Sequence, residues 1–137
     1  MKNGFIPLAA HAMIEPVMAL LLILAPFIFG FSDNDTATIL SIVAGVVVLA
    51  TGMSTRWRLS LVKLIPLGVH KMLDLGLGVV LILAPFVLGF SDESTPTIFF
   101  IVVGLGEIVA ALATRWHPED DLAADRHRPG RSEPLNS

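Results

Sequence analysis

The chain has 137 residues, of which 54% are hydrophobic and only 15% charged, and its mean hydropathy of +0.77 is far above that of a typical water-soluble domain. This composition predicts a membrane protein and excludes a large soluble enzyme domain. A formal net charge of -3 gives no reason to expect nucleic-acid binding, and the lack of cysteine excludes disulfides, iron–sulfur sites and thiolate nucleophiles.

Four apolar runs follow one another along the chain, at residues 8–31, 37–53, 67–90 and 96–113. Each is long enough, or nearly so, to cross a hydrocarbon core of about 30 Å as a helix. The runs are continuous and do not alternate with polar residues, which favours helices over barrel strands. The sequence therefore predicts an all-α integral membrane protein with four transmembrane helices and the lipid bilayer as its surroundings.

The chain contains an internal repeat. Residues 6–57 laid over residues 65–116 at a constant offset of 59 match at 24 of 52 positions without a gap. We therefore expect a tandem duplication of a two-helix unit, with repeats at 1–61 and 62–116 and a disordered cytoplasmic tail at 117–137. A unit with two spans returns the chain to its starting side, so the two copies should be parallel and not inverted.

Charge next to the spans predicts the orientation. All nine lysines and arginines fall on the side of the termini and of the link between the repeats, whereas the two opposite loops carry only acids. The positive-inside rule then puts both termini in the cytoplasm, and we expect a multi-pass protein of the plasma or inner membrane. Trp57 and Trp116 end the second and fourth spans beside arginines, and we expect them to be anchors at the lipid headgroups.

A short motif closes the first span of each repeat. Pro26 and Pro85 cannot donate a backbone hydrogen bond, so each helix should kink or end about one turn before its outer loop. Gly30 and Gly89 then permit a left-handed or tightly packed exit. We interpret the motif as helix termination, the alternative being a broken helix that exposes carbonyls to an ion or a substrate.

The residues around these prolines, Ala25-Pro26-Phe27 and Ala84-Pro85-Phe86 with Gly-Phe following, resemble the SPW repeat of small bacterial and archaeal membrane proteins. In that family each repeat is a helix pair with a Ser-Pro-Trp motif near the end of its first helix. Here Ala stands in place of Ser and Phe in place of Trp. The resemblance covers residues 6–116 and implies a membrane location and a helix-pair fold, with no settled activity.

Five ionisable residues fall inside the spans, where a charge costs roughly 2.5 to 3.5 kcal/mol even on lenient scales. His11 precedes Glu15 by four residues, and His70 precedes Asp74 by four, so each pair shares one helical face. Glu107 stands where the first repeat has Val48, and we expect it to face the bundle interior near His70 or Asp74.

Three interpretations of this cluster compete. The favoured one is local His–carboxylate pairing that holds the helix ends at the cytoplasmic side. The second is a proton or cation path in which Glu15, Asp74 and Glu107 face a shared cavity. The third is a metal or haem site that uses His11 and His70.

The absence of a phosphate loop, a nucleophile elbow or a zinc-protease motif argues against an enzyme, and no cofactor is expected. We expect a structural or partner-binding membrane component, possible partners being a second copy of the chain or another membrane protein. The alternatives are a small proton- or cation-coupled transporter and a His-ligated metal or haem protein.

Overall fold

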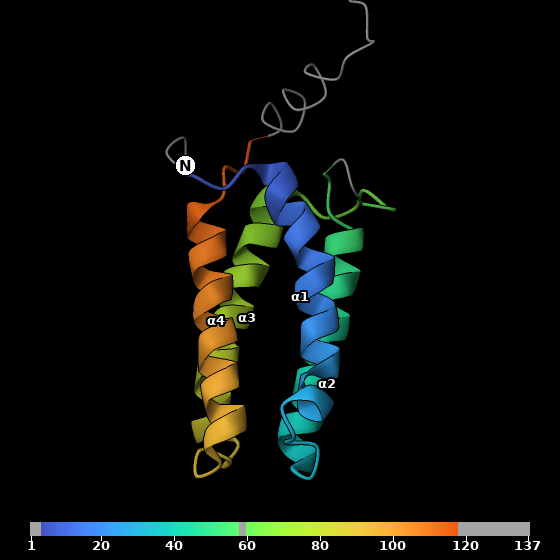
Figure 1. Ribbon diagram of the computed structural model, residues 1–137. Helices are drawn as coiled ribbons and strands as arrows, with labels where there is room; N and C mark the ends of the chain where they lie inside the picture. The colour runs from blue at the N-terminus through green and yellow to red at the C-terminus, as the bar shows by residue number, and fades with distance from the viewer. Residues whose placement is uncertain (1–3, 58–59, 118–137) are drawn as a thin grey trace, which may run out of the picture.

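The computed structural model describes residues 4–57 and 60–117, and these form four helices (Figure 1). They are α1 (Leu8–Ile28), α2 (Asp35–Met53), α3 (Leu67–Val87) and α4 (Ser94–Ala113). All four are long and apolar enough to cross a membrane, so the chain is an all-helical, multi-pass membrane protein. Beyond His117, the predicted tail lies outside the described residues.

The helix ends at the loops within each pair differ from the predicted runs by two or three residues, and the other ends coincide with them. α1 and α3 end earlier than expected because Gly30 and Gly89 have φ angles of 75° and 82°, which stop the helix. The amide of Phe31 then donates to the carbonyl of Pro26 at 2.9 Å, and Phe90 repeats this bond to Pro85. The apolar runs therefore extend past the helices into these left-handed turns.

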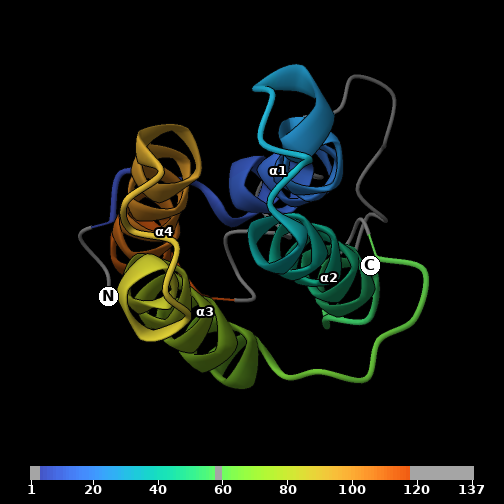
Figure 2. The same cartoon turned by 90° about the horizontal axis from the view of Figure 1, so that it is seen from below.

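The helices form two antiparallel pairs, α1 with α2 and α3 with α4, as the end-on view shows (Figure 2). Both connecting loops lie at one end of the bundle, so the pairs run in the same direction (Figure 1). We call this end, with loops 29–34 and 88–93, the acidic end, and the opposite one the basic end. The common direction agrees with a parallel repeat, while the duplication itself stays a prediction.

Glycines bring the helices of each pair into close contact. A Cβ atom on Gly45 of α2 would lie only 2.7 Å from the carbonyl oxygen of Ala19 on α1. A Cβ atom on Gly104 of α4 would lie 2.6 Å from the carbonyl oxygen of Gly78 on α3. Small residues at both contacts allow the backbones to approach, which drives helix association in lipid.

A shared apolar core lies between the pairs. It contains side chains from both units, including Leu22, Val48, Leu81 and Phe100, all nearly inaccessible. Most of the remaining large apolar side chains on the helices point outward and are exposed, as expected for surfaces that face lipid acyl chains.

Two backbone crossings, each a short hydrogen-bonded contact between segments far apart in the chain, lie at the basic end. The segment before α1 pairs with the residues that follow α4, and the segment before α3 pairs in the same way with the residues that follow α2. In the first crossing, Ile6 N donates to Ala113 O and Arg115 N donates to Ile6 O, both at 3.0 Å. In the second, Ile65 N donates to Ser54 O at 2.7 Å and Arg56 N donates to Ile65 O at 2.8 Å.

The orientation predicted from charge can be tested directly. A reporter that is active only in the cytoplasm should work when fused after Ser137 and fail when inserted at Asn34 or Glu93, because in the sequence all nine lysines and arginines flank the termini and the link between the repeats. A periplasmic reporter at the same three positions provides the reciprocal control. Activity of the cytoplasmic reporter at Asn34 and Glu93 alone would reject the charge argument.

Candidate functional site

Four of the five predicted ionisable residues meet near the basic end of the bundle. His11 and Glu15 come from α1, and His70 and Asp74 come from the equivalent positions of α3. We call these four residues the quartet. All are buried, with no more than 4% of any residue exposed. The i, i+4 spacing within each helix turns each pair toward the other helix.

Each histidine contacts both carboxylates through its Nε2 atom. His11 Nε2 lies 3.0 Å from Oε1 of Glu15 and 3.1 Å from Oδ2 of Asp74. His70 Nε2 lies 3.0 Å from the same Glu15 oxygen and 3.2 Å from Oδ1 of Asp74. The quartet is therefore one connected network across both helix pairs, and not two separate local pairs.

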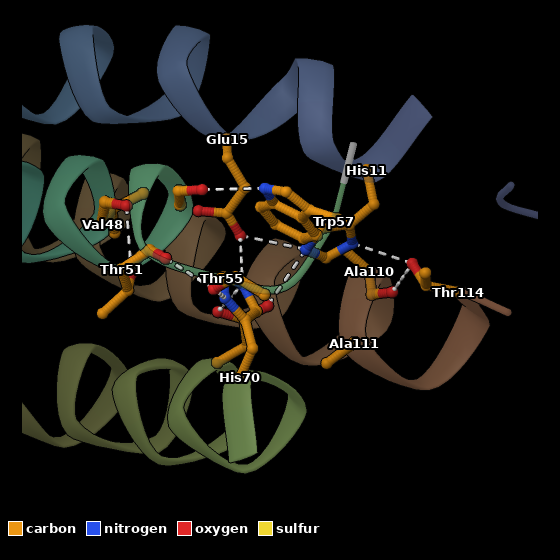
Figure 3. A network of polar contacts seen from close by, with 12 residues as sticks. His11, Glu15, Val48, Thr51, Thr55, Trp57, His70, Ala110, Ala111 and Thr114 are labelled. Atoms are coloured by element: carbon orange, nitrogen blue, oxygen red, sulfur yellow. Dashed lines mark hydrogen bonds and ion pairs between the residues drawn. The ribbon is translucent and has the colours of Figure 1, made fainter. Parts of the chain in front are cut away.

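The Nδ1 atoms are held by two threonines that follow the helices of the opposite unit. His11 Nδ1 lies 2.8 Å from Thr114 Oγ1, and His70 Nδ1 lies 2.6 Å from Thr55 Oγ1 (Figure 3). Each threonine hydroxyl donates its proton to a carbonyl one turn earlier, of Ala110 or Thr51. The hydroxyl oxygen must then accept from the imidazole, so the proton resides on Nδ1 of both histidines.

Two indole rings cover the quartet. Trp57 has its ring centre 4.6 Å from that of His70, and Trp116 has its ring centre 4.8 Å from that of His11. The indole N–H of Trp57 donates to the carbonyl of Gly52, and that of Trp116 donates to the carbonyl of Ala111. Both rings are buried, with 2% and 9% exposed. This corrects the expected role as headgroup anchors, because satisfying the indole N–H within the bundle turns each ring inward.

Glu107 lies on α4 and is buried as expected, with 7% of the residue exposed. Its electrostatic neighbours are the four members of the quartet. Within residues 4–57 and 60–117, however, Glu107 forms neither a hydrogen bond nor an ion pair. It is an acid beside the quartet and not a member of it.

The proline–glycine motifs do not belong to this site. Pro26 and Pro85 are buried in the last turns of α1 and α3, and Gly30 and Gly89 form the turns that follow, at the acidic end. A separate polar pocket of about 190 Å³ lies there between the two loops and includes Asn34 and Glu93 in its lining. The geometry of the motifs agrees with helix termination.

Sequence reasoning missed Thr55 and Thr114 as members of the site. Both belong to the repeated Thr-Arg-Trp run, at 55–57 and 114–116, whose threonine orients a histidine and whose tryptophan covers it. The recurrence of the whole run was the available signal, since two of its three side chains serve the quartet.

Among known families, the SPW repeat domain matches residues 9–114. This range includes the quartet, both threonines and all four helices except Leu8, the first residue of α1. Neither a curated protein nor a solved structure shows a significant match to the chain.

Proposed function

On the premise that this chain belongs to the SPW repeat domain family, we propose that it is a non-catalytic structural component of the membrane. The observation that carries the proposal is the crossed pairing of the quartet. His11 bonds Asp74 at 3.1 Å, and His70 bonds Glu15 at 3.0 Å, so each histidine joins the two helix pairs. The four groups form a buried polar network that holds the two helix pairs together inside an apolar bundle.

The outer surface supports association with lipid and with other membrane helices. Large apolar side chains are exposed on all four helices, for example Leu20 on α1, Val46 on α2, Val80 on α3 and Val102 on α4. In a bilayer such faces contact acyl chains, a second copy of this chain or another membrane protein. We propose that both termini lie in the cytoplasm and the protein in the plasma or inner membrane, because the basic residues of the sequence flank the termini and the link between the repeats.

A second candidate function is proton- or cation-coupled transport, favoured by Glu107. Glu107 is a buried acid with no ion-pair partner among residues 4–57 and 60–117. Such an acid is expensive at membrane depth, and residues of this kind mark ion pathways in many transporters. Glu107 breaks the likeness of the two units, because Val48 at the equivalent position packs in the apolar core. Glu15 and Asp74, in contrast, are each paired with both histidines, which supports the structural role.

Reconstitution separates the two candidates. Liposomes that contain the purified protein should show no more proton or K⁺ flux than protein-free liposomes when a pH gradient or a potential is applied. This expectation rests on the burial of the quartet and on the two indole rings, Trp57 and Trp116, that pack against its histidines.

Glu107→Gln is the matched variant, since it is isosteric with the protonated acid and should leave folding intact. Flux in the wild type that disappears in Glu107→Gln would establish transport and refute the purely structural role. Equal, background-level traces for both proteins are the expected result.

A further inference from the structure

We propose that the quartet binds one divalent transition-metal ion, of the Zn²⁺ type, through Nε2 of His11 and His70 and the carboxylates of Glu15 and Asp74. The four residues place one ligand atom each within 4.8 Å of one another. The proposal goes beyond the structural role, because a network held by hydrogen bonds alone would join the helix pairs without a metal ion.

The hydrogen bonds of the threonines carry the argument. Because Thr55 and Thr114 donate to backbone carbonyls, Nδ1 of each histidine is the protonated nitrogen. In a neutral imidazole Nε2 then presents a lone pair, and this lone pair points at carboxylate oxygens that also present lone pairs. Such an arrangement is repulsive unless a positive charge lies between the atoms. A metal ion supplies that charge and uses all four lone pairs at once.

The spacing of the donor atoms suits a small ion. A tetrahedral ion with bonds of about 2.0 to 2.2 Å holds its ligand atoms roughly 3.3 to 3.6 Å apart. Both Nε2 atoms lie 3.0 Å from Oε1 of Glu15, and they lie 3.1 and 3.2 Å from different oxygens of Asp74. One ligand atom from each residue lies within 4.8 Å of the others, so an ion would widen the short separations and draw the longer ones together. Two imidazoles and two carboxylates are also a donor set that Zn²⁺ and its first-row neighbours accept.

Charge and an unpaired atom support the same occupant. When both imidazoles are neutral, as metal ligation requires, the two carboxylates give the quartet a charge of -2, and a divalent ion would make the buried site neutral. Oε2 of Glu15 is buried and has no hydrogen-bond partner among residues 4–57 and 60–117. The contacts with the two histidines therefore leave part of the Glu15 carboxylate unsatisfied, which favours a further positive charge at the site.

The surroundings resemble those of metal sites with an outer shell of support. A ligating histidine usually donates its other N–H to an oxygen that fixes the ring, which is the role of Thr55 and Thr114 here. Trp57 and Trp116 pack against the rings. A four-ligand site covered in this way fits a structural ion that holds helices together.

Metal titration of the intact chain tests the proposal. The full-length protein, purified with a tag that lacks histidine and reconstituted in nanodiscs, is stripped with chelator and titrated with Co²⁺. We expect one equivalent of Co²⁺ to produce the visible d–d absorption of tetrahedral coordination, and Zn²⁺ to displace it. Elemental analysis of the protein before stripping should give close to one divalent ion per chain.

Variants distinguish this site from adventitious binding. Glu15→Gln and Asp74→Asn should abolish the tetrahedral spectrum, and Thr55→Val should weaken Co²⁺ binding by about 10- to 100-fold without removing a ligand. A variant with Asn at both His117 and His127, the two histidines outside the quartet, should bind as the wild type does.

A folded wild type, verified by circular dichroism, that shows no tetrahedral Co²⁺ spectrum would overturn the proposal and assign the positive charge to protons on the imidazoles. An octahedral spectrum, or one lost only in the His117 and His127 variant, would also overturn it. The wild-type spectrum decides the question even if a quartet variant fails to fold.

Discussion

Replacing His70 with alanine should lower the free energy of unfolding by about 3 to 5 kcal/mol, the range seen when one partner of a buried ionic network is removed. His70 is fully buried, and its loss leaves both carboxylates of the quartet without one of their two nitrogen partners. The measurement is reversible unfolding of the reconstituted protein by steric trapping or by denaturant in mixed micelles. His11→Ala should have a similar effect, because it makes the equivalent contacts.

His117→Ala is the matched control, since His117 lies outside the helices and its Nε2 has no hydrogen-bond partner among the described residues. A double-mutant cycle of His70→Ala with Glu15→Gln should give an interaction free energy of about 0.5 to 3 kcal/mol. A cycle that closes to zero, or a His70→Ala variant as stable as wild type, would contradict the idea that the quartet joins the helix pairs.

A single methyl group at Gly104 should have a comparable effect on stability. The new Cβ would lie 2.6 Å from the carbonyl oxygen of Gly78 and 3.1 Å from the backbone nitrogen of Ile82, and backbone atoms cannot rotate away. Helices α3 and α4 must therefore separate, at an overpacking cost of about 1 to 3 kcal/mol or more. The unfolding free energy of Gly104→Ala measures this directly.

Gly106→Ala tests the same substitution two residues along the same helix. Apart from the adjacent backbone of α4, no atom of residues 4–57 and 60–117 lies within 4 Å of a Cβ at Gly106. This variant should therefore be as stable as wild type or slightly more stable, because alanine favours helix over glycine. Gly45→Ala should reproduce the loss in the other pair, where its Cβ would meet Ala19. Equal stabilities of Gly104→Ala and Gly106→Ala would show that close backbone contact does not hold the pair together.

The sequence predicted the helices well because lipid imposes a simple requirement. A span needs about 20 apolar residues, and the four runs supply them. The ends were less predictable, since apolar residues continue past the point where Gly30 and Gly89 turn the backbone. Hydropathy indicates which residues can lie in lipid, whereas the end of each helix depends on the φ angle of one glycine.

The quartet was predicted in part. The i, i+4 spacing put His11 with Glu15 and His70 with Asp74, because helix geometry alone brings such residues onto one face. The crossed contacts between α1 and α3 could not be predicted in the same way, since no periodicity within one helix says which face of another helix it meets. The inward rotation of Trp57 also depends on a tertiary contact, its bond to the carbonyl of Gly52.

The two backbone crossings at the basic end have a consequence for how the chain is connected. Ile6 meets Thr114 as Ile65 meets Thr55, so the start of the first unit rests on the end of the second just as the second rests on the first. The two helix pairs therefore contact each other in the same way at both crossings, although the chain connects them covalently at only one, between α2 and α3. Circular permutation, which opens the link between the units and joins the original ends, would exchange the order of the helix pairs while keeping every contact of the crossings. We therefore expect that either helix pair could come first in the chain, and be translated first, without a change in the fold.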